Sequence, residues 1–465
     1  MPINEKLFGL YTSTLSQYTI QTLKTLIFLR YGLNEISELK LRSVPHPTVP
    51  GVGLIQNSEG ERIEDGTIIG TVRMGYGHHR MAYSLYTWAI ANKKKAYLHD
   101  ILAFNIKESQ AIKEIDGFYS QMSRSSAEIG GIIEWLWGQL MSQGNISSLQ
   151  FSVELAERYK NLLGGLNPEM PYISTYPLNG QIAVESGFKK VVHLIPDNFP
   201  QYYLLVPGAI NLVQSPASYM RFIEMGIPKN SLVVAGHWVS QKLSSSAIDH
   251  SEARIIRDDN KQKRRFLLAI GGAGAQKNYT MTVLSKIKEK LIGEKFYFWI
   301  NTGDHSALFQ ELKEKAESLK IPYTTIEDWD TFRAFCNERN LEKKDEPSTQ
   351  PLVLFNFSNY YHAFSATDEL MTISDILITK PSELAFFPIP KIFIRRVGDH
   401  EAASAFRSME LGEGTMECRE PEHALEMIEL FLEKGGIFNR MNECIIRNSR
   451  EGVYDGAKTA ISLVS

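Results

Sequence analysis

The sequence predicts an α/β protein with two Rossmann-like domains, each built on a doubly wound and mostly parallel β-sheet. The chain has 465 residues, whereas a single hydrophobic core stops growing at roughly 250 to 300 residues. Short apolar bursts alternate with helix-spaced segments, which is typical of βαβ units. The bursts form two series, and the polar, charged segment 241–265 that separates them is predicted to be the interdomain linker.

Each domain is expected to follow the same plan of strand, glycine-rich turn and helix. A helical appendage is predicted at 1–66, because apolar residues recur at helical spacing between Leu15 and Tyr31. The domains are predicted at 67–240 and 266–440, and 441–465 is expected to form a helix that returns to the first domain. The expected strands are 67–72, 96–98, 172–174, 190–194, 209–213 and 231–235 in the first domain, and 266–270, 296–301, 322–326, 352–355, 376–379 and 391–394 in the second.

Composition excludes several classes of protein. The net charge is only −3, so no global field attracts nucleic acid, and the three cysteines are too far apart for a disulfide framework or a zinc pattern. No apolar run is long enough to cross a membrane. We therefore expect a cytoplasmic protein. Trp135 and Trp137 belong either to a core helix or to an apolar rim that touches a lipid-like acceptor at a membrane surface.

The first glycine turn, at Gly75, Gly77 and His78, follows a buried strand. Glycine allows the backbone to turn tightly and to approach a ligand, and a helix is predicted to begin near His78. The turn should therefore lie at the carboxyl edge of the sheet, where open α/β folds bind ligands. His78 could accept a proton from an acceptor hydroxyl, with His79 beside it. Alternatively, the glycines serve only the turn and both histidines are solvated helix caps.

The second glycine turn comes directly after the first strand of the second domain. Gly271, Gly272 and Gly274, followed by Gln276, could present backbone N–H groups to a diphosphate. The Gly-Lys-Ser/Thr ending of a Walker loop is absent, and so is the acidic residue that a dinucleotide fold places about twenty residues later. A simple tight turn is the alternative.

Polar residues also follow two later strands of the second domain. Thr379, Lys380 and Pro381 end one strand, and Ser382 with Glu383 could cap the next helix or bind a ribose hydroxyl. After the next strand come Asp399, His400 and Glu401. Each group alone is typical of a surface loop, but their recurrence after successive strands indicates a binding edge.

The order of these motifs resembles the GT-B glycosyltransferases, in the branch of monogalactosyldiacylglycerol synthases, diacylglycerol glucosyltransferases and the lipid II-forming N-acetylglucosaminyltransferase. The turn at Gly75–His78 resembles the family's Gly-His turn, and Pro196-Asp197 resembles its Thr-Asp stretch. Thr379-Lys380-Pro381 resembles its Thr-Lys-Pro-Gly-Gly run, although Ser382-Glu383 stands where the family has Gly-Gly. The resemblance covers roughly residues 67–440.

The resemblance implies two domains that face a cleft and an inverting, metal-independent transfer from a nucleotide sugar, UDP-linked by preference, to a lipid or amphipathic hydroxyl. No cofactor is implied beyond the donor substrate. His78 would be the base, with Asp197 as the rival, and Gly75, Gly77, His79, Trp135 and Trp137 would contact the acceptor. The donor residues would be Gly271, Gly272, Gly274, Gln276, Thr379, Lys380, Pro381, Ser382, Glu383, Asp399, His400 and Glu401. A nucleotide-sugar 2-epimerase and a catalytically inactive sugar-nucleotide-binding protein stay open as alternatives.

Overall fold

The computed structural model describes residues 7–33, 35–122, 146–271, 276–342, 350–396 and 401–464. The chain divides into two compact units, each with its own sheet. The first unit comprises Met1–Met74, Met81–Trp238 and Gly456–Ser465, and the second comprises Gly75–Arg80 and Val239–Asp455. The predicted fold class, two α/β domains with mostly parallel sheets, is therefore confirmed.

The first unit contains an eight-stranded sheet in the order β1-β2-β4-β3-β5-β6-β7-β8. Only β1 and β2 pair antiparallel; every other pair in this sheet is parallel. The strands are β1 (Leu41–Pro45), β2 (Val52–Asn57), β3 (Thr67–Thr71), β4 (Ala96–Asp100), β5 (Tyr172–Ser174), β6 (Val191–Leu194), β7 (Ile210–Val213) and β8 (Leu232–Val234). Because the chain leaves β3 toward β4 and then returns to its other side as β5, the strand order reverses beside β3.

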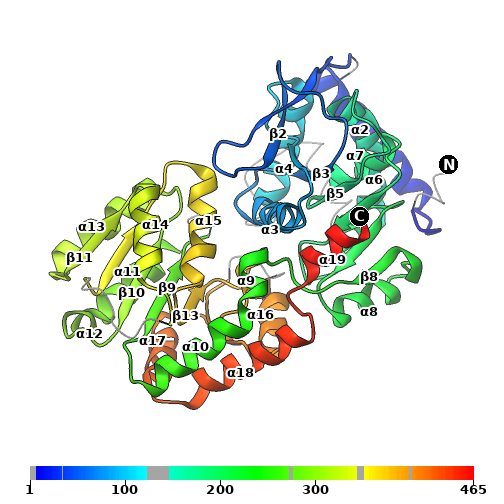
Figure 1. Cartoon of the computed structure of the whole chain (residues 1–465). Coiled ribbons are helices and arrows are strands. Elements are labelled where there is room, and N and C mark those ends of the chain that lie inside the picture. Colours follow the sequence, from blue (N-terminus) through cyan, green and yellow to red (C-terminus); the bar gives the residue numbers. More distant parts are fainter. Residues whose placement is uncertain are drawn as a thin grey trace. The chain divides into compact units, whose positions relative to one another are not determined.

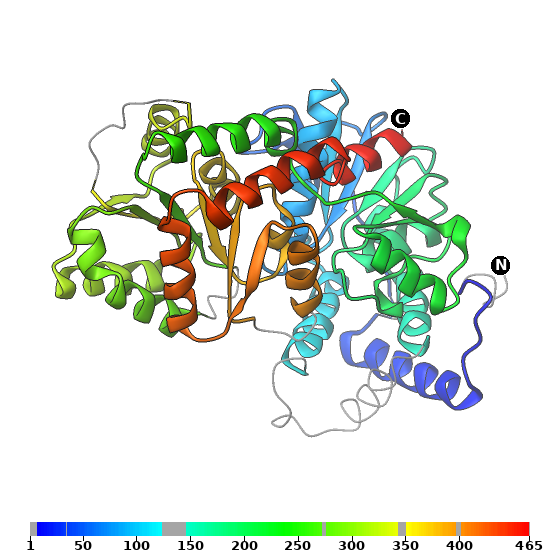
Figure 2. The same ribbon diagram turned by 90° about the horizontal axis from the view of Figure 1, so that it is seen from below.

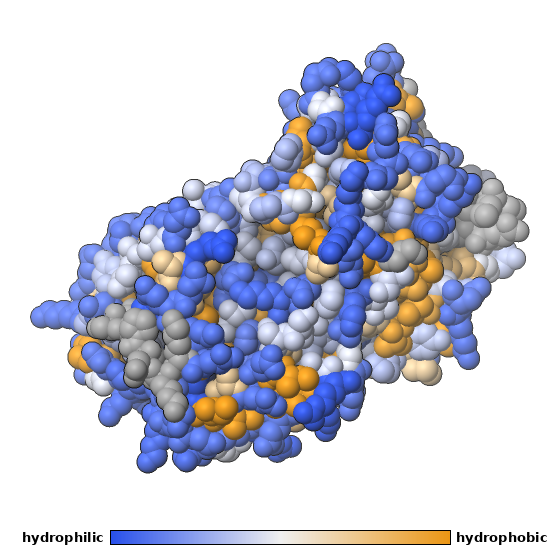
Figure 3. Space-filling model, viewed as in Figure 1, coloured by the Kyte–Doolittle hydropathy of each residue, from blue (hydrophilic) through white to orange (hydrophobic). Residues whose placement is uncertain are grey.

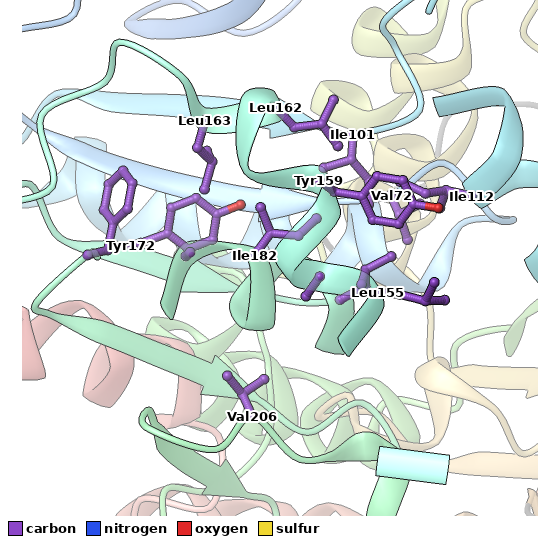
Figure 4. Close-up of a cluster of buried hydrophobic side chains, with 14 of the residues drawn as sticks. Val72, Ile101, Ile112, Leu155, Tyr159, Leu162, Leu163, Tyr172, Ile182 and Val206 are labelled. Carbon is purple, nitrogen blue, oxygen red and sulfur yellow. The ribbon is translucent and has the colours of Figure 1, made fainter. Parts of the chain in front are cut away.

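Helices of the first unit pack on this sheet and bury its apolar side chains. They are α2 (Thr14–Tyr31), α3 (Gly77–Ala91), whose first residues Gly77–Arg80 cluster with the second unit, α4 (Lys107–Met122), α6 (Ser147–Ala156), α7 (Pro177–Glu185), α8 (Pro216–Glu224) and α19 (Gly456–Leu463), with short 3-10 helices at Glu157–Leu163, Tyr202–Leu204 and Lys229–Ser231. Figure 4 shows part of the largest core, in which Leu155, Tyr159 and Ile182 pack against side chains such as Val72 and Tyr172.

The predicted helical appendage at 1–66 is wrong in part. Helix α2 confirms the helix expected there, but Ile20, Leu23 and Ile27 of this helix are buried in the main core of the first unit. The same region also supplies β1 and β2, which extend the sheet beyond β4. The segment is therefore an integral part of the first unit, because its apolar residues complete a core that the sheet alone leaves open.

The second unit contains a seven-stranded sheet in the order β11-β12-β10-β9-β13-β14-β15, and all its pairs are parallel. The strands are β9 (Arg265–Ala269), β10 (Tyr297–Asn301), β11 (Tyr323–Ile326), β12 (Leu352–Phe355), β13 (Ile376–Thr379), β14 (Lys391–Ile394) and β15 (Gly414–Cys418). The order reverses between β9 and β13, so the carboxyl ends of these two strands lie side by side at the switch point of the sheet.

Helices cover both faces of the second sheet (Figure 1). They are α9 (Gln241–Ser245), α10 (Ala247–Asp259), α11 (Lys277–Lys286), α12 (Lys288–Ile292), α13 (Ser306–Leu319), α14 (Trp329–Glu338), α15 (Tyr360–Met371), α16 (Glu401–Glu410), α17 (Pro421–Leu432) and α18 (Gly436–Arg450), with a 3-10 helix at Glu383–Phe386. Helices α11, α13 and α17 share one apolar core with alternate residues of the strands, such as Phe266 and Leu268. Trp299 of β10 packs instead against Phe335 of α14. The unit is thus doubly wound.

The predicted linker at 241–265 is also wrong, because helices α9 and α10 and the start of β9 occupy it. Helix α10 packs along α18 (Figure 2). Two of its buried residues are arginines: Arg254 donates to the carbonyls of Met371 and Ser374 at 2.9 Å, and Arg257 pairs with Asp375 at 3.2 Å. Because these buried positions of α10 hold arginines and not apolar residues, the sequence lacks the apolar periodicity of a helix. Its polar composition therefore indicated a linker.

All the predicted strands are present, and all of them lie within or match the predicted ranges except β4 and β9, which extend beyond them. In the described ranges three strands were missed: β1, β2 and β15. Two of these, β1 and β15, are edge strands in which buried and exposed positions are mixed. Edge strands lack the continuous apolar run that marks a strand buried on both faces.

Hydrophilic residues cover most of the face in Figure 3, with smaller apolar areas between them. Among the described residues, none of the helices has the length and apolar character that a membrane span requires. Helix α2 nevertheless exposes Leu15, Tyr18 and Leu29, whose relative exposures are 77%, 70% and 65%.

Candidate functional site

The switch point of the second sheet brings a glycine and a lysine together. Gly271 follows β9 and Lys380 follows β13, at the carboxyl ends of neighbouring strands. A Cβ atom added to Gly271 would lie only 2.9 Å from Cε of Lys380, so the lysine runs closely along the glycine backbone. Nε2 of His305, at the start of α13, lies 3.2 Å from the carbonyl oxygen of Gly271. A cationic side chain and an imidazole therefore flank this turn.

Two carboxylates lie at the same edge. Glu401, at the start of α16, is buried and forms an ion pair with Nζ of Lys380. Burial alone would raise the pKa of Glu383, but the positive charges of Lys380 and Arg80 and a hydrogen bond from Ser382 outweigh it, so its pKa is lowered. Glu383 is therefore ionised and can accept hydrogen bonds from hydroxyl groups of a ligand.

The first glycine turn belongs to this unit as well. Its residues, Gly75–Arg80, cluster with the second unit rather than with the first, which corrects the prediction that they form part of the first domain. The hydroxyl of Tyr76 bonds to the carboxylate of Asp304 and accepts a hydrogen bond from the Asp304 N–H at 2.9 Å. Tyr360 donates to the carbonyl of Gly75 at 2.5 Å. These long-range contacts, rather than chain proximity, decide where the turn lies.

Arg80 anchors the other end of the turn segment. Its guanidinium contacts Asp368 of α15 at 2.7 Å, and both side chains are almost fully buried. Arg80 also donates to the carbonyl of Phe364 at 3.1 Å, and Ser240 donates to Asp368 at 2.9 Å. A Cβ atom added to Gly77 would lie 4.0 Å from Oε2 of Glu383. The turn thus passes directly beside the ionised carboxylate.

The two histidines of the turn have different surroundings. His79 is 2% exposed and packs edge-on against Tyr360 at 5.2 Å between ring centroids. Its surroundings are those of a packed aromatic cluster rather than of an open acceptor surface, so the alternative of a solvated cap is wrong for His79. His78 is half-buried at the start of α3.

An aromatic pair lies at the carboxyl ends of β11 and β12. The rings of Trp329 and His362 stack at 4.1 Å with an angle of 7° between their planes, and Phe357 packs edge-on against Trp329. Burial lowers the pKa of His362, which favours its neutral form. This pair could not be predicted from the sequence, because the two residues come from different helices and no local motif links them.

The other predicted site residues are distributed as follows. Thr379 and Pro381 are buried, Gln276 donates to the carbonyl of Arg395, and Ser382 makes no side-chain cap at the 3-10 helix that follows it. Asp197 is half-buried after β6 in the first unit, whereas His78 belongs to the second. The positions predicted at Trp135, Trp137, Gly272, Gly274, Asp399 and His400 lie outside the described residues. Within the described ranges, no group of three or more histidine, cysteine and acidic side chains could hold a metal ion.

Comparison with known families covers both halves of the chain. Residues 227–465, more than half of the chain, match the family described as "Domain of unknown function (DUF6938)". The chain belongs to the DUF6938 family. Residues 12–224 match the family described as "Domain of unknown function (DUF6937)". None of the curated proteins matches the sequence.

Several solved structures are similar to this DUF6938 protein. UDP-GlcNAc 2-epimerase from Neisseria meningitidis, bound to UDP-GlcNAc, has 10% identity and a TM-score of 0.47, with 85% of this chain and 98% of that chain covered. A glycosyltransferase from Rickettsia africae has 13% identity and a TM-score of 0.41, covering 86% and 98%. HepE from Anabaena, in complex with UDP, has 12% identity and a TM-score of 0.41, covering 85% and 97%.

Proposed function

We propose that this DUF6938 protein is a glycosyltransferase that binds a nucleotide sugar, preferably a UDP-sugar, at the carboxyl edge of its second unit. The observation that carries the proposal is the arrangement around Gly271: Lys380 runs along the glycine backbone, and the ionised Glu383 lies four residues after the end of the adjacent strand β13. A cation and a closely approaching backbone can bind a diphosphate, and a carboxylate can accept hydrogen bonds from the hydroxyl groups of a ribose. The switch point offers both.

In this proposal each group has a separate task. Lys380 contacts the diphosphate, Glu401 orients Lys380 through their ion pair, and Glu383 accepts hydrogen bonds from the ribose. Negative charge grows on the departing diphosphate during transfer, and a preorganised cation such as Lys380 stabilises it.

His78 is the proposed base, and Asp197 is the rival. The acceptor oxygen forms a bond to the anomeric carbon while the bond from that carbon to the diphosphate oxygen breaks, and the acceptor proton passes to the base. Inversion at the anomeric carbon rests on the resemblance of the motifs to GT-B glycosyltransferases. His78 is favoured because Gly77, its neighbour, lies beside Glu383.

Donor binding tests the proposal. We expect UDP-sugars to raise the melting temperature of the protein, because a ligand that binds only the folded state stabilises it. Lys380→Ala should weaken binding about 10- to 100-fold, since it removes a charge-assisted contact to phosphate. Lys277→Ala removes an exposed lysine that pairs with Glu311 and should bind normally. Absence of nucleotide-sugar binding in the wild type, measured by calorimetry, would refute the proposed donor site.

The acceptor is proposed to be a lipid or another amphipathic molecule. Helix α2 supports this part, because Leu15, Tyr18 and Leu29 are exposed while Ile20, Leu23 and Ile27 fix the helix to the core. A helix that exposes apolar side chains on one face can lie in a membrane interface through that face.

Binding to liposomes that contain anionic lipid tests the membrane contact. A triple variant in which serine replaces Leu15, Tyr18 and Leu29 should bind liposomes more than about tenfold more weakly. Each apolar side chain that enters the membrane interface adds to the free energy of binding. A matched control replaces Phe406 and Met416, which are 67% and 73% exposed in the second unit, and should bind as the wild type does. Equal binding by the wild type and the triple variant, measured by co-sedimentation, would contradict the membrane contact.

A further inference from the structure

The glycine turn before His78 is flexible unless another contact fixes its backbone conformation. Gly75 has a positive φ of 74°, and no heavy atom lies within 4 Å of the position a Cβ would take. A segment with glycines at both Gly75 and Gly77 has many accessible backbone conformations, and fixing one of them costs conformational entropy. A side chain that fixes the turn is therefore needed if His78 is to keep one position.

Tyr76, between these glycines, makes the contacts that can do this. Its side chain is 4% exposed, and its hydroxyl both donates to the Asp304 carboxylate and accepts from the Asp304 N–H at 2.9 Å. A Cβ atom at Gly303, which has a φ of 62°, would overlap this hydroxyl. The ring of Tyr76 packs against Tyr360 at 5.6 Å, and Tyr360 itself donates to Gly75. The loop after β10 is thus shaped to receive this tyrosine.

The protonation state of Tyr76 suits this role. Burial and the hydrogen bond to Asp304 raise the pKa of Tyr76 far above its usual value. The hydroxyl therefore keeps its proton at neutral pH and donates it to the carboxylate, while its oxygen accepts from the backbone. The Tyr76 hydroxyl thus acts as donor and as acceptor toward the same residue, Asp304.

We propose that Tyr76 is a positioning residue, which locks the glycine turn onto Asp304 and so holds Gly77 and His78 beside Glu383. The catalytic consequence of this inference rests on the proposed function. The lock, by which we mean the two hydrogen bonds between Tyr76 and Asp304, involves residues of the second unit alone. Tyr76 does not take part in the chemistry; it restricts the turn so that the base and the donor carboxylate keep one relative position.

Hydrogen exchange measures the lock without any substrate. Tyr76→Phe keeps the ring and removes the hydroxyl, so amides of residues 75–80 should exchange about tenfold faster, as expected when a hydrogen bond to a charged group is lost. Asp304→Ala should give a similar change, and the double variant should add little to either single one. Tyr279→Phe is the matched control, because it removes another buried hydroxyl of the same unit, which bonds to the Cys418 carbonyl at 2.8 Å.

The turnover of Tyr76→Phe then distinguishes a loss of positioning at the site from a general loss of stability. With a UDP-sugar as donor, Tyr76→Phe should lower kcat about tenfold or more, while the donor Kd changes less than about twofold. Unchanged exchange in 75–80, or exchange that rises equally throughout the second unit, would overturn the lock. If the wild type binds no nucleotide sugar, the proposed function fails, and the exchange result still decides the lock by itself.

Discussion

His78→Ala is expected to lower the turnover of nucleotide sugar and acceptor by about two to four orders of magnitude, the contribution of a positioned general base. Donor affinity should change little, because the proposed donor contacts come from Lys380 and Glu383. The expected signature is therefore a fall in kcat with a nearly constant donor Kd. Steady-state kinetics together with calorimetric binding would measure both quantities.

His423→Ala is a suitable control for this experiment, because His423 is exposed in the first turn of α17. Near-normal transfer by His78→Ala would remove its role as base and make Asp197 the residue to test next. The remaining readings are separated by their products. A 2-epimerase would convert the donor without any acceptor, and an inactive binding protein would bind the donor without converting it.

The sheets could be predicted from the sequence because their central strands are buried on both faces. Runs such as Leu352–Phe355 and Ile376–Thr379 consist almost entirely of apolar residues, and each leads into a turn or a helix. Once the strands are known, the carboxyl ends of parallel strands must share one edge. Gly271, Lys380 and Glu383 could therefore be predicted to lie at one edge of the sheet. The strand order, which places β9 beside β13 and Gly271 beside Lys380, could not be predicted from the sequence.

The position of the glycine turn could not be predicted in this way. Local sequence puts Gly75–Arg80 after β3 and thus in the first domain, whereas the partners of Tyr76 and Arg80 are 228 and 288 residues away in the chain. Tertiary contacts of single polar side chains leave no periodic signal. The buried contacts of Arg254 and Arg257 also leave no periodic signal. Helix α10 could therefore not be predicted from a segment that has the composition of a linker.

The buried ion pair that fixes this turn should have a large effect on stability. Asp368→Ala is expected to lower the free energy of unfolding by about 3–5 kcal/mol, because it leaves the charge of Arg80 buried without its partner. Burial raises the pKa of Asp368, and the opposing effects of Arg80 and Ser240 do not fully offset it. The cost of burying the Asp368 carboxylate therefore exceeds its attraction to Arg80. The intact pair contributes little to the free energy of unfolding, whereas removing one partner leaves the other charge buried and is destabilising.

Removing both charges is the decisive comparison. The double variant Arg80→Met with Asp368→Leu should recover most of the stability that Asp368→Ala loses, since apolar residues of similar size avoid the desolvation cost. Because the folded-state pKa of Asp368 is raised, the folded protein holds this proton at pH values where the unfolded chain has lost it. Stability from this group therefore falls as the pH rises past 3.8, the ordinary aspartate value, and the double variant should lack that dependence. Urea unfolding of the three proteins across this pH range measures both effects, and a double variant as unstable as Asp368→Ala would show that the pair stabilises the fold through attraction.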